Sequence, residues 1–238
     1  MVKLGIIGAM AVEVRTLKQQ LINLRSSSIA GMEFCEGSLE GLPVVVVQCG
    51  VGKVHAALCV QILCDCFGVT HLVNTGVAGS LSAELDIGDF VISRDAMYHD
   101  FTCHALNPDY KTGQIPGLNV QAFPADERLV FYAQNAAQQV HPGHARVGRI
   151  ASGDQFVASK TQKAQIVEDT GAVCTEMEGG AIAHAAWSNG VPFVVIRAIS
   201  DKADDSAQMD YPSFEAAAAE RCARVTQRLA AQLKAAEE

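Results

Sequence analysis

Short runs of β-branched residues alternate with segments of helical periodicity, and this alternation constrains the fold more than any other feature of the chain. Residues 193–199 form one such run, which follows a Gly-Val-Pro turn signal and is too short for a typical helix. Comparable runs cover residues 2–8, 70–74, 89–93, 145–151 and 173–175. Strands alternating with helices predict an α/β fold, with a mixed, largely parallel central sheet flanked by helices on both sides.

Helical patterns fill most of the intervening segments. A first helix is expected from Ala9 or Met10 onward, and its pattern includes Glu13, Leu17, Leu21 and Leu24. Further helices are predicted at residues 53–67, 126–139, 160–169 and 179–188 and from Tyr211 to the C-terminus. Residues 33–39 and 44–49, separated by Gly-Leu-Pro, are expected to pair as a hairpin. No repeat, low-complexity tract or linker is visible, so we expect a single domain over residues 1–238.

Charge and hydropathy exclude several classes of function. The net charge of −8 argues against binding nucleic acid through its phosphates, although a local site could still hold a small nucleoside. No apolar stretch approaches the 18 or so residues that a membrane span needs. The apolar part of the N-terminus is too short for a secretory signal, so a cytoplasmic protein is expected.

The eight cysteines have the spacing of neither a disulfide framework nor a zinc site. Cys59, Cys64 and Cys66 fall in one apolar helical segment, and the others are scattered. Small buried thiols in a reducing compartment account for them. We therefore expect no metal and no other cofactor.

Polar residues follow several of the predicted strands. Residues 193–199 lead into Ser200 and Asp201, at the position where open α/β sheets bind ligands, although a lone aspartate there could equally cap the next segment. Arg197 lies in this same run, and other strand ends supply Met10 and Glu13, Gly76 to Gly79, Phe156 and Val157, and Glu176 to Glu178. Carboxylates gathered in one cleft shift each other's pKa values, which suits general acid/base chemistry. No Ser-His or Cys-His nucleophile accompanies them, and the glycine loops do not match phosphate-binding patterns.

The region from Tyr98 to Phe123 contains prolines and glycines and shows no regular pattern. A loop of this length within a compact domain is usually a binding loop, a lid or an interface.

Seven motifs in this order resemble the bacterial 5′-methylthioadenosine/S-adenosylhomocysteine nucleosidase family across nearly the whole chain. They are Gly5-Ile-Ile-Gly8-Ala-Met10-x-x-Glu13, Gly50-Val-Gly52-Lys53, Asn74-Thr-Gly76-Val-Ala-Gly79, Tyr98-His-Asp100, Ser152-Gly-Asp154-x-Phe156, Glu176-Met-Glu178 and Arg197-Ala-Ile-Ser200-Asp201. The resemblance implies a nucleoside phosphorylase-like three-layer fold. It also implies hydrolysis of the N-glycosidic bond of adenine nucleosides that carry a 5′-thio substituent.

The resemblance also implies a role for each matching residue. Glu13 would activate the attacking water, and Asp201, held by Ser200, would protonate N7 of adenine. Glu178 would bind the ribose hydroxyls. The remaining substrate-binding positions are Met10 and Val77 at the sugar, Phe156 and Val157 at adenine, Glu176, Met177 and Arg197 beside the sugar and the water, and Tyr211 and Phe214 at the 5′-group.

Three features depart from the commonest family pattern, one of them being a long loop that has about two additional residues before Gly113. Val77 stands where a serine or threonine is frequent, which removes one hydroxyl from the sugar site. Residues 101–106 also differ from the usual run of the long loop. In the family this loop crosses to a neighbouring subunit, so Leu106 and Pro116 would complete the partner's pocket in a homodimer.

Three alternatives remain open. A phosphate-dependent nucleoside phosphorylase would have the same fold, but it would need donors such as arginines near the first and fifth strand ends, where none occurs. A nucleosidase for another 5′-modified adenosine, such as aminodeoxyfutalosine, would share every motif. A non-catalytic nucleoside-binding protein should lack an intact acid/base set, whereas Glu13, Glu178 and Asp201 are all present.

Overall fold

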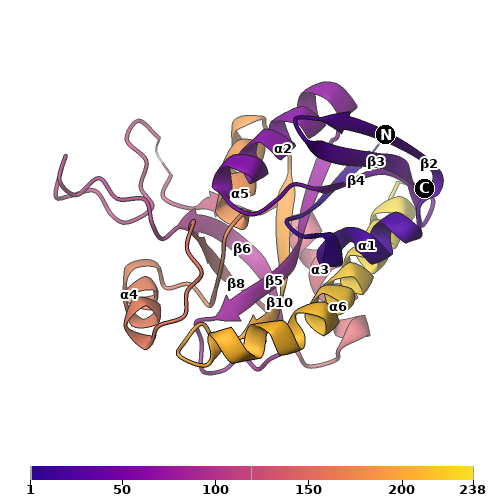
Figure 1. Cartoon of the computed structure of the whole chain (residues 1–238). Coiled ribbons are helices and arrows are strands. Elements are labelled where there is room, and N and C mark those ends of the chain that lie inside the picture. The colour runs from indigo at the N-terminus through magenta and orange to yellow at the C-terminus, as the bar shows by residue number, and fades with distance from the viewer. Residues whose placement is uncertain (1, 119, 238) are drawn as a thin grey trace.

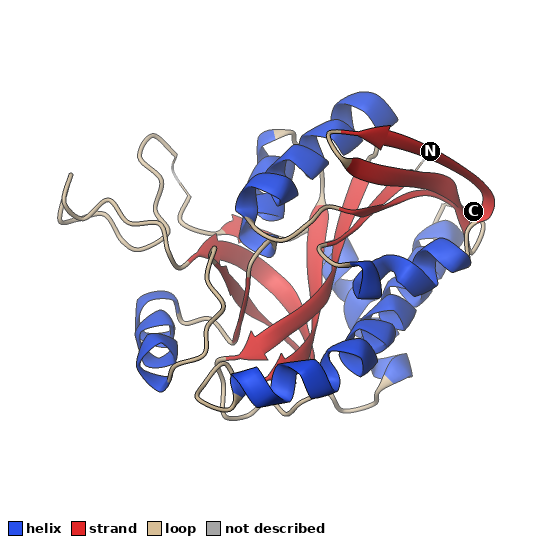
Figure 2. Ribbon diagram, viewed as in Figure 1, coloured by secondary structure: helices blue, strands red, loops and turns tan. Residues whose placement is uncertain are grey.

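The computed structural model describes residues 2–118 and 120–237, which form a mixed β-sheet covered by helices on both faces (Figures 1 and 2). The strands are β1 (Leu4–Gly8), β2 (Ile22–Ile29), β3 (Met32–Leu39), β4 (Leu42–Gln48), β5 (His71–Ser80), β6 (Phe90–Tyr98), β7 (Phe123–Pro124), β8 (Ala145–Ser152), β9 (Cys174–Glu176) and β10 (Phe193–Asp201). The helices are α1 (Ala11–Gln19), α2 (Lys53–Phe67), α3 (Glu127–Val140), α4 (Lys160–Thr170), α5 (Gly179–Ser188) and α6 (Ala207–Ala235). The predicted α/β architecture is confirmed.

The sheet is partly closed on itself. Its strand order is β10-β6-β8-β9-β5-β1-β4-β3-β2, and β10 pairs with β5 as well as with β6. Strands β5, β10, β6, β8 and β9 therefore form a ring, while β1 to β4 extend from it as an open sheet. The closure brings the short strand β9 and the end of β10 to either side of β5.

Alternating side chains along the strands divide the core into two layers. In β4, Val44 and Val46 belong to an apolar cluster that includes residues of α1, α3 and α6, whereas Val45 and Val47 belong to a second cluster that includes residues of α2 and α5. The period of two in a strand sends successive side chains to opposite faces, and here both faces are apolar because helices cover both. This two-sided burial explains the nearly continuous apolar runs seen in the sequence.

The predicted first helix is too long. Helix α1 ends at Gln19, and residues 22–29 form β2, which pairs antiparallel with β3. The leucines Leu17, Leu21 and Leu24 have helical spacing by coincidence, since Leu24 lies in the strand and is exposed. As an edge strand with mostly exposed side chains, β2 lacks the apolar alternation by which a strand is recognised.

Strands β5, β6 and β10 continue further than predicted, and β6 runs on to Tyr98. Strand β5 runs on to Ser80, so Gly76 to Gly79 lie within it, and β10 runs on to Asp201. The two strands pair along this added length, with Arg197 opposite Gly76 and Asp201 opposite Gly79. Mutual hydrogen bonding thus extends both strands through residues whose small or polar side chains indicate a strand end.

The segment between β6 and β7 projects from the body of the molecule, on the left of Figure 1. It contains no helix or strand over its described residues, as predicted. Helix α6 begins at Ala207, about one turn before the predicted Tyr211. Among the described residues, no helix is both long and apolar enough to cross a membrane.

Candidate active site

A cavity of about 250 Å³ opens where β5, β9 and β10 meet the start of α1. Twelve predicted site residues line it: Met10, Glu13, Val77, Phe156, Val157, Glu176, Met177, Glu178, Arg197, Ser200, Asp201 and Tyr211. Residues as far apart in the chain as Met10 and Tyr211 thus face one space, although the role of each remains a prediction.

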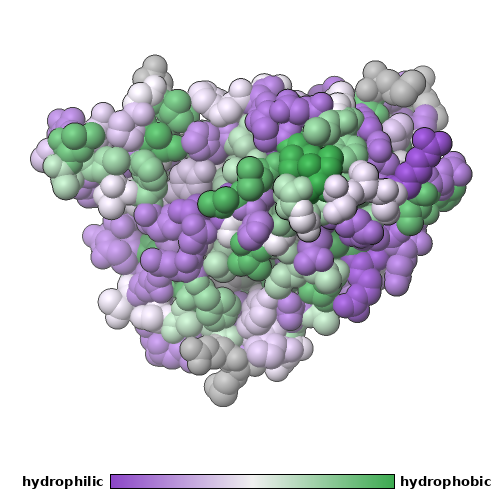
Figure 3. Space-filling view, turned by 45° about the horizontal axis from the view of Figure 1, so that its top comes forward, coloured by the Kyte–Doolittle hydropathy of each residue, from purple (hydrophilic) through white to green (hydrophobic). Residues whose placement is uncertain are grey.

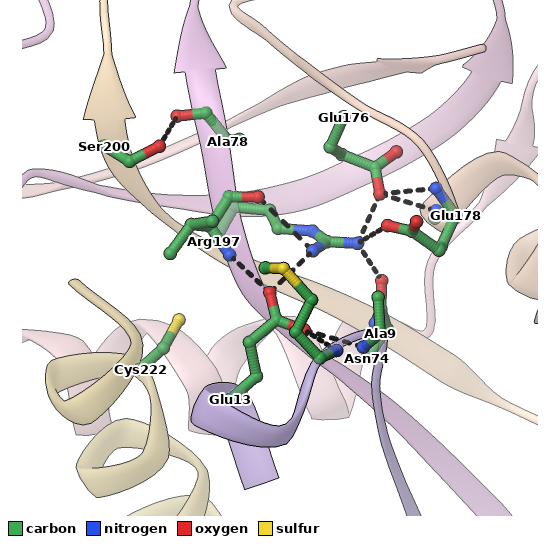
Figure 4. A network of polar contacts seen from close by, with 12 residues as sticks. Ala9, Glu13, Asn74, Ala78, Glu176, Glu178, Arg197, Ser200 and Cys222 are labelled. Carbon is green, nitrogen blue, oxygen red and sulfur yellow. Dashed lines mark hydrogen bonds and ion pairs between the residues drawn. The ribbon is translucent and has the colours of Figure 1, made fainter. Parts of the chain in front are cut away.

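Arg197 forms the centre of the polar part of this site (Figure 4). Its side chain is only 1% exposed, and Nη2 pairs with Glu176 Oε2 and lies 3.5 Å from Glu178 Oε2. Nη1 lies 3.8 Å from Glu13 Oε1. Nη2 also donates to Asn74 Oδ1 at 2.6 Å. One buried cation therefore faces three carboxylates that come from three different elements.

The imbalance of charge changes the acidity of the cluster. Burial raises the pKa of Glu178 to about 7, opposed by the positive charge of Arg197 and assisted by the neighbouring Glu176. Burial likewise raises the pKa of Glu13, again opposed by Arg197. Burial disfavours the Arg197 cation, but the three carboxylates outweigh it and raise the pKa of Arg197. Near neutral pH the site can thus hold both protonated and ionised carboxyl groups.

Glu13 is held by backbone donors at the start of α1. Its Oε2 accepts the N–H groups of Ala9 at 2.6 Å and Met10 at 2.9 Å, and its Oε1 accepts Val77 N–H at 3.1 Å. A glutamate in the first helical turn that accepts the N-cap amide is a common capping arrangement. A carboxylate has about four acceptor positions, so one is left for a ligand or water.

Gly76 allows the side chains of Glu13 and Arg197 to lie close to strand β5. A Cβ atom there would collide with Glu13 Oε1 and Arg197 Nη1. Strand β5 therefore needs a residue without a side chain at the point where the carboxylate and the guanidinium cross it.

Asp201 lies at the end of β10, beyond a local irregularity. The pairing with β5 shifts register between Ile199 and Asp201, a bulge of the kind that redirects side chains beside active sites. Asp201 Oδ2 accepts the Ser200 hydroxyl at 2.9 Å, and Oδ1 accepts Ala203 N–H at 2.8 Å. Burial raises the pKa of Asp201 despite these two hydrogen bonds, which favours a carboxyl group that can donate a proton.

Two aromatic side chains also line the cavity. Phe156 and Tyr211 meet edge to face, with ring centroids 5.6 Å apart, and Phe156 is 48% exposed. The Tyr211 hydroxyl lies 3.2 Å from Met10 Sδ and donates to Glu215 Oε1 at 3.0 Å. A flat apolar ligand could enter between these rings and the carboxylates.

Three predicted residues lie outside the cavity lining. Phe214 is on α6 but is 41% exposed, while Leu106 and Pro116 lie in the projecting segment, where Leu106 is 73% exposed. Residues that sequence reasoning did not assign to the site also contribute. Val51 and Thr175 line the cavity, and Asn74 and Ser152 bind Arg197 and Glu176. Val51, Asn74 and Ser152 lie inside the recognised motifs, and Thr175 lies directly before one. No other feature of the sequence points to them as site residues.

The pH dependence of stability follows from the pKa of Glu178. A carboxyl whose folded-state pKa is raised stabilises the fold below its unfolded value of 4.5, and this contribution is lost as the pH rises through about 7. We expect the Tm of the ligand-free protein to fall more between pH 5 and pH 8 than that of Glu178→Gln. Equal slopes in thermal melts of the two proteins would contradict the assignment.

Comparison with known proteins gives the class first and then the family. Residues 3–231 match the model of the phosphorylase superfamily, the class that the ring-containing sheet and its buried carboxylates define here. The chain is 40% identical over 215 residues to the 5′-methylthioadenosine/S-adenosylhomocysteine nucleosidase of Psychromonas ingrahamii, covering 89% of this chain and 91% of that protein. It therefore belongs to the 5′-methylthioadenosine/S-adenosylhomocysteine nucleosidase family.

Solved structures agree with this assignment. The nucleosidase of Colwellia psychrerythraea 34H, determined in complex with adenine, superposes with a TM-score of 0.93 at 38% identity, covering 98% of this chain and 96% of that one. A futalosine hydrolase of Helicobacter pylori strain 26695 superposes with a TM-score of 0.91 at 32% identity, covering 97% and 98%.

Proposed function

We propose that this protein hydrolyses the N-glycosidic bond of 5′-methylthioadenosine and S-adenosylhomocysteine, releasing adenine and the 5-thio-ribose. The observation that carries the proposal is the placement of Glu13, Glu178 and Asp201 around one cavity that Phe156 and Tyr211 also line. Together with membership of the nucleosidase family, this arrangement supports acid/base cleavage of an adenine nucleoside.

Asp201 is the proposed general acid. Adenine leaves poorly as an anion, and protonation at N7 turns it into a neutral leaving group as the bond to the sugar breaks. The raised pKa of Asp201 keeps its proton available, and the bonds from Ser200 and Ala203 fix the direction of the carboxyl group. A positioned acid contributes about 10²–10⁴-fold to the rate.

Glu13 and Glu178 are proposed to act on the sugar side. As the bond breaks, the ribose gains oxocarbenium character, which nearby negative charge stabilises. Glu13 would take a proton from the attacking water, and Glu178 would accept hydrogen bonds from the ribose hydroxyls. Arg197 keeps these carboxylates together, since it contacts both.

The superfamily also suggests phosphorolysis, and the site supports hydrolysis instead. Arg197 is the only arginine among the described residues that line the cavity, and it is occupied by carboxylates. Phosphate needs several donors, and Glu13 would repel it. Adenine release should therefore proceed at the same rate with and without phosphate. A requirement for phosphate, with ribose-1-phosphate as product, would refute the hydrolase proposal.

A nucleosidase for a different 5′-substituent is the second candidate. The superposition on a futalosine hydrolase favours including it, since the adenine and ribose ends would be the same. Relative kcat/KM on methylthioadenosine, S-adenosylhomocysteine, 5′-deoxyadenosine and aminodeoxyfutalosine decides between them. We expect the two 5′-thio compounds to give the higher values.

We further propose a cytoplasmic homodimer. Exposed apolar residues occur on α2 and the preceding loop, at Val51, Val54 and Leu58. Figure 3, in which the top of the molecule in Figure 1 is turned toward the viewer, shows apolar side chains gathered on this face. Such a patch favours contact with a partner. In the dimer, Leu106 and Pro116 of one protomer would line the neighbour's pocket. Free cysteines at all eight positions are compatible with a reducing compartment.

Val54→Glu tests the dimer. Val54 is 71% exposed, so the change should not harm the protomer's own core but should oppose association by placing a charge in the apolar patch. Light scattering should show a smaller mass, and KM for methylthioadenosine should rise as the neighbour's loop is lost. Ile22→Glu, at an exposed site on β2, is the matched control and should leave the mass unchanged. An unchanged mass for Val54→Glu would place the interface elsewhere.

A further inference from the structure

Three of the recognised motifs contain polar side chains that have no role in the chemistry described above, and these side chains meet at one point. Lys53 is the first residue of α2, Asp100 lies just after β6, and Asp154 is in the loop after β8. Lys53 Nζ binds both oxygens of Asp100, at 2.7 and 2.8 Å, and lies 3.7 Å from Asp154 Oδ2. We refer to these three residues as the Lys53 cluster.

Asp154 provides the cap that α2 lacks. The N-cap residue of this helix is Gly52, which has no side chain and a φ of 96°. Asp154 Oδ1 instead accepts the Lys53 N–H, at 2.9 Å, from a loop about a hundred residues away. A capping carboxylate accepts a hydrogen bond from a backbone amide that has no partner within the helix, and its negative charge interacts favourably with the positive end of the helix dipole. The position of the helix start thus depends on Asp154.

The amide directly before Lys53 serves the candidate active site. Gly52 N–H donates to Glu178 Oε1 at 2.9 Å. Apart from Arg197, whose Nη2 lies 3.5 Å from Oε2, this amide is the donor that the described residues present to the Glu178 carboxylate. The Lys53 and Gly52 amides belong to adjacent peptide planes joined at the Gly52 Cα atom, so anchoring Lys53 N–H restricts the positions that Gly52 N–H can take.

The cluster also anchors the loop that follows β8. Asp100 Oδ2 accepts Asp154 N–H at 2.8 Å, two residues before Phe156. The Lys53 ammonium lies 5.3 Å from the centroid of the Tyr98 ring, which adds a cation–π contact. Asp100 therefore restrains the loop that carries Phe156, which is proposed to bind adenine. The Asp154 side chain restrains the start of α2, beside the proposed ribose ligand Glu178.

We propose that Asp154 and Asp100 are positioning residues, which act through Lys53 to hold the Gly52 amide against the carboxylate that binds ribose. The proposal rests on the proposed function, because it takes Glu178 to be the ribose ligand. It extends that function by assigning a task to Lys53, Asp100 and Asp154, which do not line the cavity.

The acidity of Glu178 gives a readout that a purely structural role would not change. The charged and titratable groups that face it are Arg197 on β10, Glu176 on β9, Glu13 on α1 and Cys49 after β4. Burial raises the pKa of Glu178, and the Gly52 hydrogen bond is among the influences that lower it. Losing that bond should raise the pKa further, so the acid limb of kcat/KM should move to higher pH.

Asp154→Ala distinguishes an effect on ribose binding from an effect on adenine binding. It removes the acceptor of Lys53 N–H but keeps the Asp154 backbone amide on Asp100. We expect KM for methylthioadenosine to rise about tenfold at pH 7, as loss of a hydrogen bond to a charged group implies. Inhibition by free adenine, which has no ribose, should stay unchanged. Asp154→Asn keeps an oxygen acceptor and should restore most of the wild-type KM.

Matched measurements keep the test decisive. Lys3→Met removes an ion pair with Glu36 that is 2.8 Å long and remote from the cavity. This control should leave unchanged the KM for methylthioadenosine, the inhibition by adenine and the pH of the acid limb. The proposal is overturned if Asp154→Ala leaves KM and the acid limb unchanged, if it weakens adenine and nucleoside equally, or if Asp154→Asn is as impaired. Absence of turnover in the wild-type protein would instead refute the proposed function.

Discussion

Asp201→Asn should lower kcat for adenine release by about 10²–10⁴-fold, the contribution of a positioned general acid. Asparagine has almost the same shape, and its amide oxygen can still accept the Ala203 N–H that Asp201 Oδ1 accepts now. What it cannot do is transfer a proton to N7 of adenine. The measurement is single-turnover adenine release, with binding of adenine followed separately by calorimetry.

Two results fix the interpretation of this variant. Adenine binding within a few-fold of wild type would show that the pocket is intact, and it would also separate a catalyst from a non-catalytic nucleoside-binding protein. Ser200→Ala is the matched control. It removes one donor to Asp201, at 2.9 Å, but leaves the carboxyl group, so it should reduce kcat far less. Wild-type turnover in Asp201→Asn would remove this residue from the mechanism.

Arg197→Met should produce the largest loss of stability of any single change in the site, about 3–5 kcal/mol in the free energy of unfolding. Methionine approximates the length of the arginine stem but leaves Glu13, Glu176 and Glu178 buried without a counter-charge. Breaking a buried ion pair from one side costs more than the pair contributes, since the remaining charge stays desolvated. Urea unfolding at pH 7.5 measures the effect.

The pH dependence of this loss identifies its cause. Without Arg197, which now lowers their pKa values, Glu13 and Glu178 should hold their protons more tightly, so the deficit should shrink near pH 5. Arg149→Met offers a comparison, because Arg149 binds Asp95 in a half-buried pair at 2.7 Å and its loss should cost much less. A deficit in Arg197→Met that does not change with pH would point to lost packing instead.

The sequence predicted the α/β class, most helices and the strands of the core. These elements have strong local signals, because helices cover both faces of the sheet and the strands are apolar throughout. It failed at β2, whose exposed side chains leave no periodic pattern. It also ended β5 early, since glycines that usually terminate a strand are retained here to let Glu13 and Arg197 approach.

By itself, the sequence determined which residues are available for chemistry: the motifs containing Glu13, Glu178 and Asp201 mark a nucleosidase. Only the tertiary structure decided how they are connected. Pairing of β10 with β5 closes a ring and places Arg197 opposite Gly76, among three carboxylates. The same long-range packing brings Asp154 to the start of α2. Such contacts join residues about a hundred positions apart, and no local pattern encodes them because their energy is gained only when the strands and loops have met.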